Sequence, residues 1–203
     1  MKYIYIAFLA SNYKTGRFIR KVTRQRYSHV VISKTEDISK MYSFARRYKN
    51  TPFVAGFVCE NLSRYTLGSA ATPVKICRLA LGEDEYAAFE EKLAPFIADP
   101  EKYRYNYFGA GAYIFRRQWK KKTAFTCLEF VLYLLNIEKF MTIAELERHL
   151  KDAVIFEGFV EELPSSGIPT DPDDPYFQRK SVAFQVQRLA ADAAALVRGK
   201  RRE

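Results

Sequence analysis

The hydrophobic and polar positions at the start of the chain follow patterns that are typical of β-strands. Residues 2–10 form a β-branched and aromatic run that suits a buried central strand. Residues 27–33 form a second such run, and residues 17–22, which lie between the two, read as a shorter and more polar strand. Residues 40–46 alternate with period two after a polar turn, so we expect them to pair antiparallel with the strand of residues 27–33.

The pattern becomes less regular in the next part of the chain. Residues 50–60 contain a proline and a glycine, which predicts an extended loop or an edge strand. Residues 74–81 are again typical of a core strand, and the acidic cluster after Gly82 begins a helix that runs to about Phe96. Residues 103–111 are first aromatic and then rich in glycine.

A helical pattern with a clear beginning follows residue 125. Thr126 and Glu129 have the spacing of a capping box, which makes Cys127 the first helical residue. Beyond Glu129 the segment is apolar on almost all sides, so we expect it to be a buried helix. The free N–H groups and the positive end of the helix dipole favour an anion at position 127, which for a thiol means a thiolate.

The remainder of the chain predicts a second capped helix, a last strand and an appendage. A capping box at residues 142–145 starts a short helix that contains His149, and residues 153–156 read as a strand. Residues 161–175 are rich in Pro, Ser, Gly and Asp, which is typical of a linker or surface loop. A helix follows from about Tyr176. Its apolar positions recur at four- and three-residue spacing as one stripe: Val182, Val186, Leu189, Ala193 and Leu196.

These patterns together predict an α+β protein. We expect an antiparallel sheet packed against the buried helix that carries Cys127, within one domain over residues 1–160. Residues 161–175 are expected to be a linker or surface loop, and residues 176–203 a C-terminal amphipathic helix with a basic tail. The apolar stripe of that helix suits docking on the domain or formation of a homo-oligomer.

Composition narrows the class of protein. A chain of 203 residues with 48% apolar residues has ample core material for one large domain, which excludes a disordered protein. Its three cysteines, Cys59, Cys77 and Cys127, are widely spaced and form no C-x-x-C motif, so we expect no disulfide framework, no metal and no cofactor. A reducing compartment, the cytoplasm, follows from this. The first residues suit a strand better than a signal peptide, and no run approaches the ~20 apolar residues of a membrane span.

Charge indicates which partners the surface could attract. The net charge is +10, and basic residues cluster at residues 17–26, 116–122 and 198–202. Such a surface attracts nucleic acid, anionic lipid head groups or acidic ligands, and it is equally typical of a solvated surface. No recognisable nucleic-acid-binding motif is present in the sequence.

Two residues supply candidate chemistry. Cysteine hydrolases need a thiolate, a base to partner it and a group that orients the base. Cys127 at a helix start and His29 on an apolar strand provide the first two, although each residue alone is also typical of packing. His149 lies in a charged helix, which indicates a surface residue, and the strand contexts of Cys59 and Cys77 indicate packing.

The order of these motifs resembles a known family. Tyr-Ser-His-Val-Val-Ile precedes a second strand, and Thr-Cys-Leu-Glu-Phe-Val opens a helix about a hundred residues later. This looks like the circularly permuted branch of the NlpC-type papain-like cysteine hydrolases, in which the histidine strand comes before the cysteine helix. That branch includes the lecithin:retinol acyltransferase-like enzymes. The resemblance covers approximately residues 3–135.

The resemblance implies roles for individual residues. Cys127 would be the nucleophile and His29 the base. The family's third polar residue lies on the strand after the histidine strand, which makes Ser43 the candidate. Many members carry His, Glu, Gln or Asn there, so a serine departs from the family pattern, and Glu60 is a back-up. The family also places a tyrosine and glycines before the cysteine, near the oxyanion site.

The nearest match to that tyrosine is Tyr105 or Tyr107, before Gly109 and Gly111, although the stretch can equally be an aromatic surface loop. The resemblance implies a thiol hydrolase or acyltransferase that acts on an amide or ester through a thioester, with a peptide-like or acyl substrate. The alternative is a non-catalytic binding protein on the same scaffold, whose basic surface holds an anionic ligand, lipid or nucleic acid.

Overall fold

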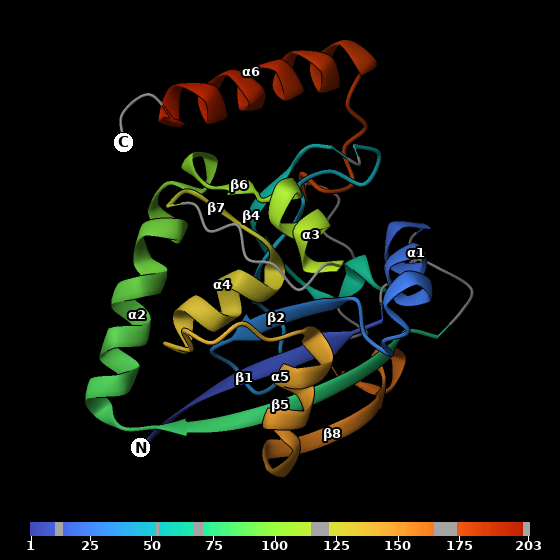
Figure 1. Ribbon diagram of the computed structural model, residues 1–203. Coiled ribbons are helices and arrows are strands. Elements are labelled where there is room, and N and C mark those ends of the chain that lie inside the picture. Colours follow the sequence, from blue (N-terminus) through green and yellow to red (C-terminus); the bar gives the residue numbers. More distant parts are fainter. Residues whose placement is uncertain (11–13, 52, 67–70, 115–121, 165–173, 201–203) are drawn as a thin grey trace.

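The computed structural model describes residues 1–10, 14–51, 53–66, 71–114, 122–164 and 174–200. Within these residues the protein is a mixed α+β structure with one eight-stranded, mostly antiparallel sheet and six α-helices (Figure 1). The strand order is β7-β6-β4-β3-β2-β1-β5-β8, and the short β6 and β7 pair in parallel. An antiparallel sheet with covering helices was the predicted fold class, and at this level the prediction is confirmed.

The strands in chain order are β1 Lys2–Leu9, β2 His29–Ser33, β3 Met41–Arg46, β4 Ala55–Glu60, β5 Pro73–Leu81, β6 Arg104–Tyr105, β7 Ala124–Phe125 and β8 Val154–Phe159. The α-helices are α1 Lys14–Thr23, α2 Glu83–Ala98, α3 Tyr107–Ile114, α4 Cys127–Leu134, α5 Ile143–His149 and α6 Val182–Lys200. A short 3-10 helix, η1 Leu62–Arg64, follows β4. The strands predicted at residues 2–10, 27–33, 40–46, 74–81 and 153–156, the acidic helix and the two capped helices are all present.

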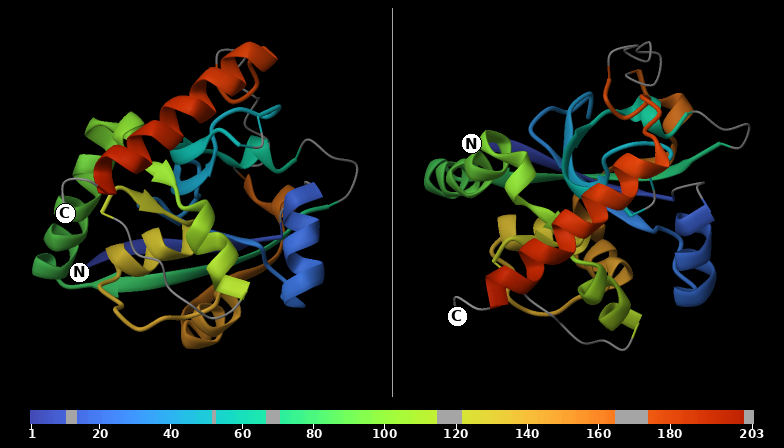
Figure 2. Two further views of the ribbon diagram at one scale, coloured as in Figure 1. Left: turned by 45° about the horizontal axis from the view of Figure 1, so that its top comes forward. Right: turned by 90° about the horizontal axis from the view of Figure 1, so that it is seen from above.

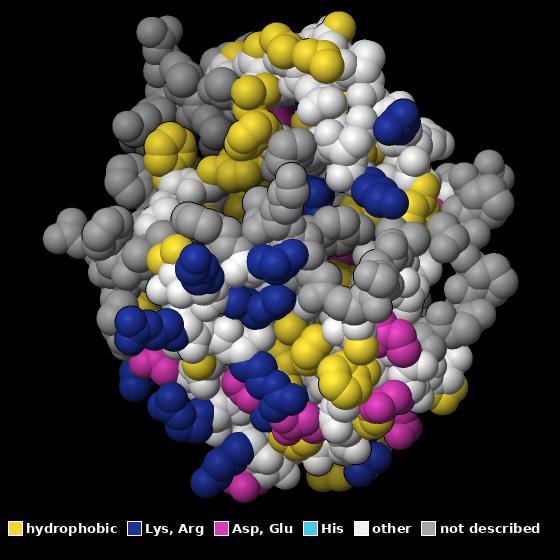
Figure 3. All heavy atoms as spheres, turned by 90° about the vertical axis from the view of Figure 1, so that its right-hand side faces the viewer, with side chains coloured by type: hydrophobic (Ala, Val, Ile, Leu, Met, Phe, Trp, Pro, Cys, Tyr) yellow, Lys and Arg dark blue, Asp and Glu magenta, His cyan; other side chains and the backbone are white. Residues whose placement is uncertain are grey.

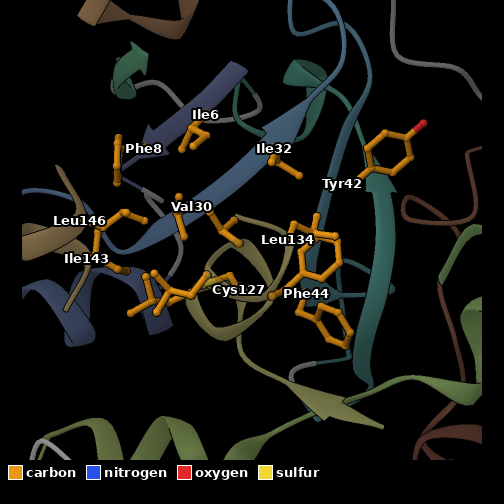
Figure 4. Close-up of a cluster of buried hydrophobic side chains, with 14 of the residues drawn as sticks. Ile6, Phe8, Val30, Ile32, Tyr42, Phe44, Cys127, Leu134, Ile143 and Leu146 are labelled. Atoms are coloured by element: carbon orange, nitrogen blue, oxygen red, sulfur yellow. The ribbon is translucent and has the colours of Figure 1, made fainter. Parts of the chain in front are cut away.

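Strand β1 lies in the interior of the sheet, as its unbroken apolar run predicts. It pairs antiparallel with β2 on one side and with β5 on the other. Its side chains alternate between two cores, because successive residues of a strand point to opposite faces. Ile4, Ile6 and Phe8 face the core that α2, α4 and α5 cover, and Tyr5 and Leu9 face the smaller core behind the sheet. Figures 1 and 4 show the helix-covered side, where Cys127 belongs to the packed cluster.

Strands β2 and β3 separate along their length. They pair antiparallel as predicted, but their ladder consists of two residue pairs, Ile32↔Tyr42 and Ser33↔Met41. The His29 end of β2 is thus paired with Leu9 of β1 and has no counterpart in the β2–β3 ladder. A side chain at that end is therefore in a position to contact groups from both faces of the sheet.

Two predicted elements were wrong. Residues 17–22 belong to helix α1 and not to a strand. The cause lies in the sequence itself, since the apolar residues Phe18, Ile19 and Val22 have the i, i+1, i+4 spacing of a helix face. Residues 55–60 form β4, which is neither a loop nor an edge strand, because it lies between β3 and β6.

Glycine makes the β4–β6 approach possible. A Cβ atom at Gly56 would lie 2.5 Å from the carbonyl oxygen of Tyr103, so a larger residue would push the two strands apart. The aromatic and glycine-rich segment of residues 103–111 contains β6 and the start of helix α3, and is not simply a surface loop.

The C-terminal helix begins later than predicted. Helix α6 starts at Val182 and not at about Tyr176, whose side chain is buried and lies 4.4 Å from the guanidinium of Arg64. Residues 116–121 of the predicted basic segment, 165–173 of the predicted linker and 201–203 of the basic tail lie outside the described residues. Among the described helices, none combines the length and apolarity needed to cross a membrane.

Candidate active site

The N-terminus of α4 holds Cys127 in the position predicted from the sequence. Glu129 N–H donates to Thr126 Oγ1 at 3.1 Å, and Thr126 N–H donates to Glu129 Oε2 at 2.7 Å, so the capping box is complete. Cys127 is the first helical residue and is 7% exposed. The helix fixes the thiol at the end where its backbone N–H groups are not used within the helix.

His29 lies between a carboxylate and the thiol. It is the first residue of β2 and is buried. Its Nε2 lies 2.9 Å from Oε1 of Glu60, and the side chain of Cys127 is close enough to raise the pKa of the ring. Since Nε2 faces Glu60, the other ring nitrogen, Nδ1, is left for the sulfur. The structure thus brings together the two residues predicted as nucleophile and base.

Charge keeps His29 protonated. Burial alone would lower the pKa of His29, but the Glu60 carboxylate and the Cys127 side chain outweigh it and raise the pKa from 6.5 to about 10. Burial alone would likewise raise the pKa of Glu60, yet His29 and, more weakly, Arg64 and Ser43 lower it to about 2. At neutral pH the pair is therefore an imidazolium and a carboxylate.

Glu60, not Ser43, contacts the histidine. The strand register places Met41 opposite Glu60 and Ser43 opposite Val58, so Ser43 and Glu60 lie on the same face of the sheet. The Ser43 hydroxyl donates to Glu60 Oε1, the same oxygen that faces His29. The residue predicted to orient His29 directly thus contacts the carboxylate behind it, and the back-up residue takes the orienting position.

The second oxygen of Glu60 is held by a residue that the sequence reasoning missed. The hydroxyl of Tyr65, just after η1, donates to Glu60 Oε2 at 2.8 Å, and its ring stacks 6.2 Å from that of His29. Burial and the Glu60 charge raise the pKa of Tyr65 well above its ordinary value, so the phenol remains a donor. Ser63 N–H donates to the side chain of Asn61 at 3.1 Å, and this hydrogen bond caps the start of η1. The Asn-x-Ser pattern after a strand is a sequence signal that could have indicated this turn.

The two candidate tyrosines occupy different environments. Burial, and after it the Cys127 side chain, raise the pKa of Tyr105 well above its ordinary value, which places this phenol within electrostatic range of the thiol. The pKa of Tyr107 is also raised by burial, but its charged neighbours are Asp192 of α6 and Arg46 of β3. Of the two, Tyr105 is the one beside Cys127.

A buried amide connects α3 to the start of α4. Asn106 Oδ1 accepts from Gly109 N–H at 2.8 Å, and Nδ2 donates to both carboxylate oxygens of Glu129 at 3.2 and 3.1 Å. A Cβ at Gly109 would lie 2.3 Å from Asn106 Nδ2, which explains the glycine. Asn106 therefore steadies the carboxylate that caps α4, a role that the sequence reasoning also missed.

Fold and site define a class: an α+β protein with a buried cysteine–histidine–glutamate cluster at the N-terminus of a core helix. No family model, no curated protein and no solved structure matches this chain. The function therefore has to be inferred from the chemistry of the cluster itself.

Proposed function

We propose that the protein is a thiol hydrolase or acyltransferase with a permuted papain-like active site. Cys127 is the nucleophile, His29 the acid and base, and Glu60 the residue that orients His29. The observation that carries the proposal is the position of the His29 ring: its Nε2 lies 2.9 Å from Glu60, and α4, which begins at Cys127, packs against the strand that carries His29, so that Cys127 raises the pKa of the ring. A nucleophile, a base and an orienting group in contact are the parts that cysteine hydrolases need.

The first half of the reaction forms a thioester. The Cys127 sulfur, as a thiolate, attacks the carbonyl carbon of an amide or ester. The imidazolium of His29 gives its proton to the leaving amine or alcohol as the carbon–nitrogen or carbon–oxygen bond breaks. A histidine whose pKa is raised to about 10 holds that proton at neutral pH, which suits it to begin as the acid.

The second half releases the acyl group. The now neutral His29 takes a proton from water or from an acceptor, whose oxygen or nitrogen attacks the thioester carbon. The carbon–sulfur bond breaks, and the thiolate–imidazolium pair is restored. Glu60 remains ionised throughout, because its pKa is lowered to about 2, and its charge favours the imidazolium at each turnover.

The negative charge that develops on the carbonyl oxygen of the substrate must be stabilised by hydrogen-bond donors. The backbone N–H of Cys127 at the start of α4 is one candidate, since it lies at the positive end of the helix. The phenol of Tyr105 is the second, because it lies within electrostatic range of the Cys127 side chain and stays protonated. Tyr107, which was predicted as the alternative, neighbours α6 and is not assigned this role.

The chain order supports the permuted assignment. The histidine strand β2 comes first, the neighbouring antiparallel strands β3 and β4 follow, and the cysteine helix α4 comes last and packs against β2 and β3. A serine as the third residue departs from the family pattern. That departure does not count against the proposal, because the carboxylate of Glu60 faces the histidine. Peptide-like amides and lipid or other acyl esters are the substrate classes that this chemistry serves.

Alkylation by iodoacetamide tests the proposal without a known substrate. We expect Cys127 to react at neutral pH roughly 100-fold faster than Cys77, because only a thiolate is alkylated and burial raises the pKa of Cys77 to about 11. Peptide mapping with time assigns the rate to each cysteine, and Cys59 provides the reference for an exposed thiol. His29→Ala should slow the alkylation of Cys127. If Cys127 reacts no faster than Cys59 or Cys77, the enzyme proposal fails and a binding protein on this scaffold is the better description.

A further inference from the structure

Helix α6 packs on the body of the protein through its charged side. Asp192 accepts from Arg104 Nε of β6 at 2.7 Å, and Arg188 pairs with Glu101. Phe184 adds an aromatic contact with the loop after β3. These residues lie on one side of the helix, since positions four apart are neighbours on its surface. The usual arrangement, in which the apolar side of a helix faces the core, is thus reversed.

The apolar side of α6 consequently faces outward. Val182, Val186 and Leu189 are 75%, 62% and 46% exposed, and Figures 1 and 2 show the helix lying across the outside of the molecule. In Figure 3 hydrophobic side chains gather at the top of the view, where α6 begins. The exposed alanines at 183, 190 and 194 extend the stripe. At 100° per residue, no charged residue falls on this outward side between Val182 and Ala194.

Basic residues stand at both ends of the stripe. Arg179 and Lys180 come just before α6, and the sequence places Arg198 and Lys200 in its last turn. The whole chain carries a net charge of +10, and Lys and Arg side chains are spread over the face shown in Figure 3. The surface that covers the stripe should therefore carry negative charge.

Charge and area both disfavour a second copy as the occupant. Two chains of charge +10 repel each other, whereas an anionic surface attracts both the basic flanks and the protein as a whole. A Val or Leu side chain offers roughly 100 Å² of apolar surface, so three of them fall short of the roughly 800 Å² per partner of a specific protein interface. Shallow insertion into a lipid surface requires no such area.

We propose that α6 docks the protein on an anionic membrane surface. The helix lies parallel to the bilayer, with the stripe of Val182, Val186 and Leu189 among the acyl chains near the head groups. The flanking arginines and lysines contact the lipid phosphates and carboxylates. The body of the protein remains attached on the other side through Arg188 and Asp192. This inference does not depend on the thiol chemistry.

Co-sedimentation with vesicles tests the docking. We expect the full chain to sediment with phosphatidylcholine vesicles that contain about a third phosphatidylserine, and far less with phosphatidylcholine alone. The double variant Val186→Ser with Leu189→Ser should weaken binding at least about tenfold, because it removes two exposed apolar side chains without changing charge. The control, Gln187→Ser with Ala191→Ser, puts two serines on the same helix beside the stripe and should stay within about twofold of the wild type.

Three results would overturn the docking proposal. The protein could fail to sediment with anionic vesicles at low salt, or the Val186→Ser and Leu189→Ser variant could bind as tightly as the wild type. The third is a dimer in sedimentation equilibrium that this variant dissociates, which would assign the stripe to a second copy. Unchanged alkylation of Cys127 in the variant would show that its fold is intact.

Discussion

Cys127 and Cys77 are the same residue type in two buried places, and their neighbours differ. Cys77 in β5 is fully buried and donates to the carbonyl oxygen of Leu150 at 3.6 Å, and burial raises its pKa to about 11. Cys127 is 7% exposed, begins a capped helix and lies near a histidine that is paired with a carboxylate. Burial is common to both, so it cannot decide the chemistry of a cysteine.

The neighbouring charges make the difference. At Cys77, burial is the main cause of the raised pKa; among the charged neighbours Lys75 favours the thiolate, and Glu147 and Glu157 act against it more weakly. Around Cys127, the His29 imidazolium is close enough for the two groups to influence each other, and Glu60 keeps the imidazolium protonated. The two sites thus differ in what dominates them, because burial prevails at Cys77 whereas a buried imidazolium lies close to Cys127.

Removing the histidine should have the largest effect. His29→Ala leaves Glu60 buried without its charge partner, so we expect the free energy of unfolding at neutral pH to fall by about 3–5 kcal/mol in urea denaturation. His149→Ala is the matched control, since that histidine is exposed in α5, and it should change stability by less than about 0.5 kcal/mol. Equal losses in the two variants would mean that the His29–Glu60 pair does not stabilise the fold.

The pH dependence of stability should follow the same pair. Because the pKa of His29 is raised from 6.5 to about 10, its contribution is complete below about pH 6.5 and is lost as the pH rises towards about 10. Because the pKa of Glu60 is lowered from 4.5 to about 2, its contribution is complete above about pH 4.5 and is lost as the pH falls towards about 2.

We therefore expect the contribution of this pair to be greatest between about pH 4.5 and 6.5, as measured by urea midpoints across the pH range. His29→Gln should remove the decline above about pH 6.5, and Cys77→Ala should keep it. A decline that survives in His29→Gln would have to come from other groups and would contradict this assignment.

Substitutions of Glu60 and Ser43 should show which of the two residues orients His29. Glu60→Gln removes the charge that keeps His29 protonated, so we expect alkylation of Cys127 to slow by about tenfold or more, the equivalent of one pKa unit. Ser43→Ala removes one hydrogen bond to that carboxylate and should cost about 1 kcal/mol of stability with a smaller change in rate. A larger rate effect from Ser43→Ala would restore the serine as the orienting residue.

The helix cap should have the smallest effect. Thr126→Ala and Thr142→Ala each remove a capping hydrogen bond of 3.1 Å, so each should cost about 1 kcal/mol in unfolding experiments. Only Thr126→Ala should also slow the alkylation of Cys127, by about two- to fivefold, because it loosens the helix end that holds the thiol. The same rate change in Thr142→Ala would point to a general loosening of the fold.

The sequence was sufficient for most of the strands and helices and for two residues of the candidate site. Cys127 was predictable because a capping box is a local signal, carried by Thr126 and Glu129 three residues apart. His29 was predictable because strand alternation and the chain order of the family select a single histidine. Helix α1 is short, and the few apolar residues Phe18, Ile19 and Val22 between polar ones fit a short strand as well as a helix face.

The orienting residue was not predictable with the same certainty. The position of Glu60 beside His29 depends on the register of β3 and β4 and on the separation of β2 from β3, and neither is encoded in local spacing. The ring of Tyr65 reaches that of His29 and the amide of Asn106 reaches Glu129, and both contacts join segments that are distant in the sequence. The outward orientation of the apolar side of α6 was equally unpredictable, because an apolar stripe alone does not determine which side of a helix packs against the protein.

The protonation state of His29 tests the central claim most directly. The protein has two histidines, so nitrogen-15 NMR of the imidazole rings can follow both through a pH titration, with His149→Gln to assign the signals. We predict that His29 carries protons on both ring nitrogens at about pH 8 and loses one near its raised pKa of about 10. A His29 ring that is already neutral at about pH 8 would contradict the imidazolium held between Glu60 and Cys127, and with it the proposed mechanism.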